Sequence, residues 1–192
     1  MLTSTNMNPF AEWNTRSPDS SPSIFGALPS IPIAPTLPVF ISDSLVLRFS
    51  ANNDVLNCVL LGPQNRTLFS ISSSGSRTSF RNVENAVFAV VDFAPHATVE
   101  VQGFTPHQRV RDWLRLTSDQ SSRGLVLGND VCFWRPMGHH IVLVSQDNTV
   151  LGRITRSADT TALEITRPAV LSNLLYPCIV SATLFLSGRH ID

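Results

Sequence analysis

The sequence predicts a mainly β domain, either a sandwich or a barrel, with one apolar helix near its C-terminal end. From Leu45 onward, short apolar runs alternate with turn-forming residues. Near the end, Ala169–Leu186 contains no charged residue. Of the 192 residues, 43% are hydrophobic and only 15% are charged, with a formal net charge of zero. This composition differs from that of a fully disordered chain, which combines low hydrophobicity with high net charge.

The expected strands are short, and turn residues such as Gly, Pro, Asn and Asp separate them. Ala86–Phe93 is nearly all apolar, which is typical of a strand buried on both faces. The Asp147-Asn148 pair predicts a hairpin turn, so we expect largely antiparallel meanders. The predicted strands are Leu45–Phe49, Leu56–Leu61, Thr67–Ile71, Ala86–Phe93, Thr98–Gln102, Val131–Trp134, Ile141–Val144, Val150–Ile154 and Ala162–Ile165.

Thr105–Leu116 interrupts the strand pattern and favours a short helix. Thr105 and Gln108 have the spacing of a capping box, and Pro106 would be the first helical residue. The alternative is a strand, which would place Arg109, Arg111, Trp113 and Arg115 on one face.

Ala169–Leu186 predicts a buried central helix of about residues 169–187, around which the strands close into a barrel. Pro177 lies near its middle and should kink it, since proline removes a helical hydrogen bond. The alternative is a membrane anchor, or a scramblase-like use of residues 169–186, because spans need about 20 apolar residues. Ser172, Asn173, Ser181 and Thr183 argue against that alternative.

Residues 1–42 predict a disordered, Pro/Ser-rich arm, which leaves residues 43–192 as the folded domain. Pro29, Pro32, Pro35 and Pro38 repeat every three residues, as in polyproline II. A scaffold that recruits partners through this arm is therefore one functional hypothesis.

Five stretches of the folded region match the pattern of a known family: Asn57–Ile71, Ala86–Asp92, Val110–Leu114, Ser122–Arg135 and Ala162–Arg189. In these stretches the sequence resembles the tubby-like barrels, and most closely a fungal family of such domains whose function is unknown. The resemblance covers about residues 43–192 and implies a closed antiparallel β-barrel around a hydrophobic C-terminal helix. This chain departs from the family pattern at Gly128-Asn129-Asp130, at Cys132 and at Ser172-Asn173.

The arginines give the main functional hypothesis, because the chain has no lysine and all 14 basic residues are arginine. Arg109, Arg111 and Arg115 flank Trp113, and guanidinium groups bind phosphate oxygens in a bidentate manner while Trp prefers the membrane interface. These four residues form a candidate site for an anionic head group. Tubby domains bind phosphoinositides, so the resemblance implies an anionic phospholipid as partner; a protein partner is the other possibility. The competing interpretation puts Trp113 in the core and the arginines in solvent, with Asp112 offsetting part of their charge.

Other functional classes lack support in the sequence. It has no nucleophile elbow, P-loop or zinc-protease motif, so we expect no enzyme activity, no catalytic residues and no cofactor. The zero net charge argues against nucleic acid as a partner. His139-His140 near Cys132 is weak evidence for a metal site, because neighbouring strand residues point to opposite faces, and a surface hairpin end is the expected alternative. Three separated cysteines and no ordinary secretory signal favour a cytoplasmic location, with nuclear or peripheral membrane alternatives.

Overall fold

The computed structural model describes residues 43–192, except 52–53 and 129, and these residues form one 13-stranded antiparallel sheet with a few short helices. The mainly β prediction is confirmed. The proposed N-terminal arm, residues 1–42, lies outside the described residues. The strands are β1 (Ser44–Phe49), β2 (Cys58–Leu61), β3 (Thr67–Ser74), β4 (Arg77–Asn82), β5 (Val87–Asp92), β6 (Thr98–Val101), β7 (Thr105–Arg109), β8 (Leu114–Leu116), β9 (Arg123–Leu127), β10 (Asp130–Met137), β11 (His140–Val144), β12 (Val150–Arg156) and β13 (Thr161–Thr166).

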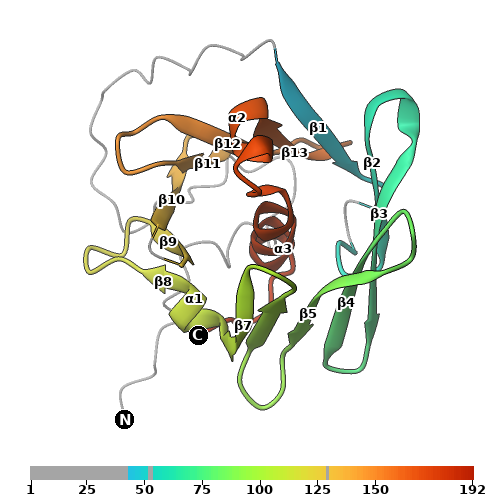
Figure 1. Cartoon of the computed structure of the whole chain (residues 1–192), viewed down its shortest axis with the longest axis horizontal. Helices are drawn as coiled ribbons and strands as arrows, with labels where there is room; N and C mark the ends of the chain where they lie inside the picture. Colours follow the sequence, from blue (N-terminus) through green and yellow to red (C-terminus); the bar gives the residue numbers. More distant parts are fainter. Residues whose placement is uncertain (1–42, 52–53, 129) are drawn as a thin grey trace.

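The sheet follows the order of the chain, with one exception at β1. The spatial order is β7-β6-β5-β4-β3-β2-β1-β13-β12-β11-β10-β9-β8. Strand β1 pairs with both β2 and β13, so the first and last strands are neighbours. The sheet therefore curls around the helix α3 (Leu175–Leu186), which Figure 1 shows in the middle of the ring of strands.

The expected closure of the barrel is wrong, because β7 and β8 are the two outer strands of the sheet and do not pair with each other. They are joined end to end by the one-turn helix α1 (Val110–Trp113). Strand β8 has three residues, and Pro106 in β7 has no N–H to donate, which suits an edge strand. We call β7, α1 and β8 together the seam. It is filled by side chains rather than by a hydrogen-bonded ladder, since Val110, Trp113 and Leu114 are all fully buried.

The prediction of a helix beginning at Thr105 is wrong. Thr105 is in a strand and pairs with Val101, and Gln108 pairs with Val99, so no capping box forms. The helix begins at Val110 and spans four residues. Pairing with β6 outweighs the local helix signal in this segment.

Two other strand predictions need correction. Ala86–Phe93 is buried on both faces only in part, since the neighbouring residues Phe88 and Ala89 are both buried, whereas Val87 is exposed and Val90 half-buried. Strand β4 was not predicted from the sequence, because only Thr78 and Phe80 point to the core and the intervening residues are polar. The hairpin turn at Asp147-Asn148 is confirmed, with Asn148 at φ 63° between β11 and β12.

The C-terminal apolar run forms two helices instead of one kinked helix. Helix α2 (Arg167–Leu171) ends at a turn where Asn173 has φ 60°, and α3 then begins at Leu175. Pro177 does not kink α3, because it lies in the first turn, where backbone N–H groups have no intrahelical acceptor. All residues of α3 from Pro177 to Leu186 are buried. Within the described part of the chain, no helix has both the length and the apolar character needed to cross a membrane.

Specific contacts fix α3 inside the sheet. The indole Nε1 of Trp134 in β10 donates to Ser181 Oγ at 3.1 Å, and its ring meets Phe185 edge-on at 5.7 Å. At the other end of α3, Tyr176 stacks on Phe88 with ring centroids 4.1 Å apart. Ser181 also donates to the carbonyl of Pro177 at 2.8 Å, so this buried hydroxyl is satisfied within its own helix.

Candidate functional site

The seam presents three arginine side chains to solvent. Arg109 ends β7, Arg111 lies in α1 and Arg115 lies in β8, and all three are exposed. In a single helical turn, positions three apart share a face, so Val110 and Trp113 turn inward while Arg111 and Asp112 turn outward. Alternation in β8 then places Arg115 outward between two more buried residues. We call Arg109, Arg111 and Arg115 the seam arginines.

Trp113 does not belong to this surface, because its side chain is fully buried. The interfacial role suggested for its ring from the sequence is therefore not available in this structure. The competing interpretation, with Trp113 in the core and the arginines in solvent, describes what is observed. Of the four candidate residues, three are therefore exposed and the fourth is buried.

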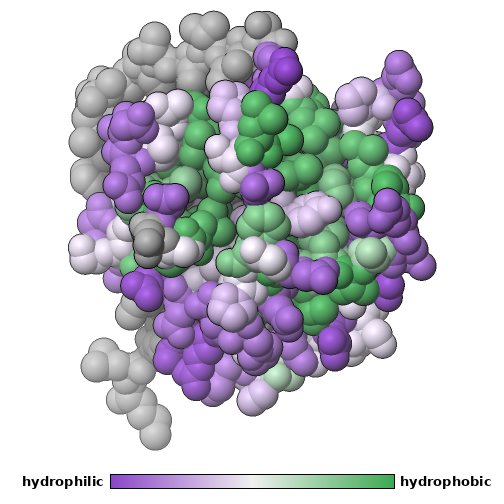
Figure 2. All heavy atoms as spheres, viewed as in Figure 1, coloured by the Kyte–Doolittle hydropathy of each residue, from purple (hydrophilic) through white to green (hydrophobic). Residues whose placement is uncertain are grey.

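The charge of the seam is moderate. Its residues include three arginines and one carboxylate, that of Asp112. Arg115 is partly positioned by α1, since its Nε donates to the carbonyl oxygen of Asp112 at 3.0 Å. The part of the face that carries α1 and β7 is predominantly hydrophilic in Figure 2. The seam is therefore a polar, weakly cationic surface and not a deep basic groove.

Sequence reasoning missed a fourth arginine, Arg123, which lies in β9 beside the seam. Its side chain is fully buried and forms an ion pair with Asp192, with Nη2 to Oδ2 at 2.6 Å and Nη1 to Oδ1 at 2.9 Å. Nη1 also donates to the carbonyl oxygen of Leu114 at 3.0 Å. The pair spans 69 positions of sequence, so only the folded chain reveals that the charge of Arg123 is neutralised.

The histidine pair lies at a hairpin tip. His139 is exposed in the turn between β10 and β11, and His140 Nδ1 is 3.2 Å from Thr155 Oγ1. Among the described residues, no group of three or more His, Cys, Asp or Glu side chains could hold a metal ion. Burial raises the pKa of the Cys58 thiol to about 12 and also raises that of Cys132, which disfavours the nucleophilic thiolate form of both.

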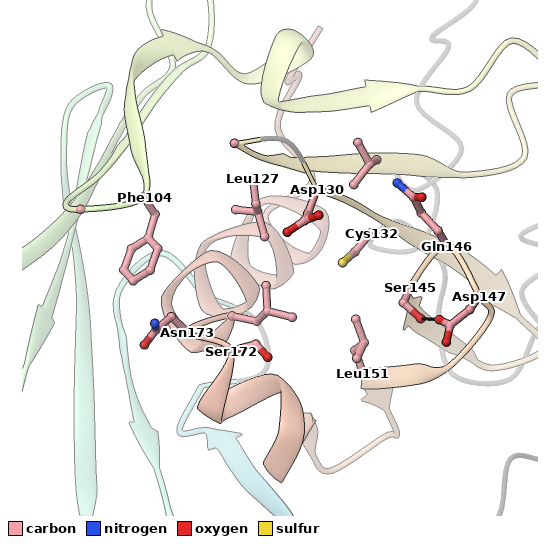
Figure 3. Close-up of a pocket in the computed structure, with 14 residues that line it drawn as sticks. Phe104, Leu127, Asp130, Cys132, Ser145, Gln146, Asp147, Leu151, Ser172 and Asn173 are labelled. Atoms are coloured by element: carbon pink, nitrogen blue, oxygen red, sulfur yellow. Dashed lines mark hydrogen bonds between the residues drawn. The ribbon is translucent and has the colours of Figure 1, made fainter.

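A concave site exists, but no residue of segment 109–115 lines it. This pocket has a volume of about 610 Å³ and is formed by the β6–β7 turn, the β9–β10 and β11–β12 hairpins and the α2–α3 turn (Figure 3). Its walls are Gly103, Phe104, Leu127, Gly128, Asp130, Val131, Cys132, Ser145, Gln146, Asp147, Leu151, Ser172, Asn173 and Leu174.

The pocket differs from the seam in charge. Its lining, as far as the described residues go, includes two carboxylates, Asp130 and Asp147, and no Arg, Lys or His. Asp147 accepts hydrogen bonds from Ser145 and from Thr149, and these bonds lower the pKa of its carboxyl, so it is ionised at neutral pH. The exposed arginines of the seam and the two carboxylates of the pocket therefore belong to different parts of the molecular surface.

A scan against protein-family models gives no match, and no similar curated protein is found. Among solved structures, a crystal structure of a protein from Arabidopsis thaliana is similar, with 10% sequence identity and a TM-score of 0.43. The match covers 72% of this chain and 91% of that chain. Because both similarity values are low, neither a family nor a function for this chain follows from it.

Proposed function

We propose that this chain is a non-enzymatic binding module of the tubby-like type whose seam arginines bind the head group of an anionic phospholipid. The observation that carries this proposal is the joint exposure of Arg109, Arg111 and Arg115 around one helical turn. The interaction would be peripheral, at the surface of a membrane.

The family assignment is part of the proposal and is supported by the arrangement of the fold. Tubby-like barrels have strands that surround a hydrophobic C-terminal helix, and here a 13-stranded sheet surrounds α3 (Figure 1). The opening between β7 and β8 is a departure from full closure, and it lies where the seam arginines are exposed.

The chemistry of the seam suits a phosphate group. Each guanidinium is a planar fork that stays charged and matches two phosphate oxygens. The buried Val110 and Trp113 hold α1 against the core, so the outward direction of Arg111 is fixed by packing. A basic residue near an anionic membrane surface contributes about 1 kcal/mol, so three arginines give modest, salt-sensitive binding.

Vesicle co-sedimentation tests the proposal. We expect the full chain to bind phosphatidylcholine vesicles containing phosphatidylserine or a phosphoinositide, and not vesicles of phosphatidylcholine alone. Replacing Arg109, Arg111 and Arg115 together by Gln should weaken partitioning roughly a hundredfold at low salt, following about 1 kcal/mol for each arginine.

The matched control replaces three exposed arginines elsewhere, Arg48, Arg66 and Arg77, by Gln. It produces the same change in net charge, so only a local site distinguishes the two variants. Equal losses in both variants would reduce the effect to bulk electrostatics. Binding of neither vesicle type would overturn the lipid proposal and leave a protein partner as the target of the seam.

A further inference from the structure

The pocket lies beside the turn that connects α2 to α3. Two hairpins form one side, and Ser172, Asn173 and Leu174 of the α2–α3 turn form the other. Asn173 is held at φ 60°, and the N–H of Ser172 and of Asn173 donate to the carbonyls of Pro168 and Val170. The backbone N–H groups of Ser172 and Asn173 are therefore hydrogen-bonded within the turn and do not provide free donors for a ligand.

The inner surface of the pocket is largely apolar. Leu127, Leu151 and Leu174 contribute aliphatic side chains, and Phe104 contributes a ring that meets Tyr176 edge-on at 6.2 Å. Its volume, about 610 Å³, is within the range of roughly 300–1,000 Å³ that small-molecule sites occupy. Such walls offer a favourable environment for a hydrocarbon or aromatic group.

The polar groups of the pocket select for positive charge. Figure 3 shows the Asp130 carboxylate directed into the space between the β9–β10 hairpin and the α2–α3 turn. The second carboxylate, Asp147, is ionised and lies on the rim with its Ser145 hydrogen bond. Since none of the described residues that line the pocket is basic, an anion would be repelled by these two carboxylates, whereas a cation would be attracted.

We propose that this pocket binds a small organic cation, namely an ammonium group attached to an apolar body. The ammonium group binds Asp130, and the apolar body lies against Leu127, Leu151 and Leu174. The site is separate from the seam arginines and takes a ligand of the opposite charge, so this inference does not depend on the lipid proposal.

Isothermal titration of the full chain with three isosteric probes tests the charge preference. We expect phenethylamine to bind at least tenfold more tightly than 2-phenylethanol, which lacks the charge, and more tightly still than 3-phenylpropanoate, which reverses it. A charge-assisted hydrogen bond in a half-open site supports a difference of about tenfold. Equal affinity for amine and alcohol, or no binding of the amine, would overturn the proposal.

Asp130→Asn tests the assigned carboxylate while nearly preserving its shape. We expect it to reduce phenethylamine affinity about tenfold and to leave 2-phenylethanol affinity unchanged. Glu84→Gln is the matched control, because Glu84 is exposed between β4 and β5 and does not line the pocket. If both variants lose affinity equally, the amine responds to overall charge and the site is wrong.

Ser172→Trp provides a second test of the binding position, because Ser172 is an exposed residue of the pocket lining. The large indole ring should occupy part of the pocket, so we expect this substitution to abolish phenethylamine binding. Binding that survives the substitution would place the amine elsewhere and contradict the assignment.

Discussion

Two fully buried tryptophans show how differently the seam and strand β10, which we call the wall, are held. Trp134 in β10 donates its indole N–H to Ser181 of α3 and packs edge-on against Phe185. Trp113 in α1 is just as deeply buried, yet its Nε1 finds no hydrogen-bond partner among the described residues. The indole N–H of Trp134 is thus hydrogen-bonded, whereas the indole N–H of Trp113 is buried without an acceptor among the described residues.

The difference follows from the topology of the sheet. At the wall, β10 is paired on both sides, by β9 and β11, so its backbone fixes where Trp134 points. At the seam, β7 and β8 do not pair, and the chain crosses between them through a single helical turn. Side-chain packing and the Arg123–Asp192 ion pair hold that crossing. The site proposed for a lipid head group thus lies at a crossing between two unpaired strands and not in a continuous hydrogen-bonded ladder.

The largest effect on stability is expected from breaking the Arg123–Asp192 pair. Asp192→Asn leaves a fully buried guanidinium without its counter-charge, and removing one partner of a buried pair costs about 3–5 kcal/mol. Because the Asp192 side chain is 35% exposed, water replaces part of the interaction, and we expect a loss of about 2 kcal/mol in urea unfolding.

The control for this experiment is the ion pair between Arg167 and Asp43, whose side chains are 67% and 65% exposed. Asp43→Asn should cost no more than about 0.5 kcal/mol, as is usual for surface pairs. A similar loss for Asp43→Asn and Asp192→Asn would show that burial of Arg123 has no special energetic role.

A smaller effect should separate the two tryptophans. Trp134→Phe and Trp113→Phe each remove a comparable volume from the core, but only the first removes a hydrogen bond. Trp113→Phe also removes a buried N–H that has no partner. We therefore expect Trp134→Phe to be more destabilising by about 1 kcal/mol in urea unfolding. Equal losses in the free energy of unfolding would mean that the indole N–H of Trp113 is hydrogen-bonded as well as that of Trp134.

An effect of similar size concerns the turn between α2 and α3, which lines the pocket together with residues of β10. Asn173 has φ 60°, a left-handed conformation that costs a β-carbon-bearing residue such as Ala about 1 kcal/mol. Asn173→Ala should lower the free energy of unfolding by about that amount, and Asn173→Gly should leave it nearly unchanged. Ser172→Ala, at φ −83°, is the control and should have little effect. Thermal unfolding of the three variants tests this order of stability.

The strands were predictable where side chains alternate or cluster by polarity. Runs such as Ile141–Val144 have that pattern, while β4 escaped prediction because Arg77, Ser79 and Arg81 make most of it polar. Segment 105–116 was misjudged for a different reason. Its capping-box spacing is a local signal, and pairing with β6, which no local pattern reveals, takes precedence.

The candidate site was predictable only as a set of residue types. The sequence places three arginines close together, but the inward position of Trp113 depends on where one helical turn meets the core. Nothing in the sequence links Asp130 with Leu174, since the pocket assembles from four separate turns.

By itself, the sequence determined that the chain is mainly β, that its charge-free C-terminal run supplies a buried helix, and that every basic group is arginine. These properties follow from composition and from local periodicity, which act over a few residues. The tertiary structure alone decided that the barrel stays open at β7 and β8, that Arg123 meets Asp192, and that acidic and cationic surfaces are kept apart. Those outcomes depend on contacts between residues distant in sequence, which exist only once the sheet has curled around α3.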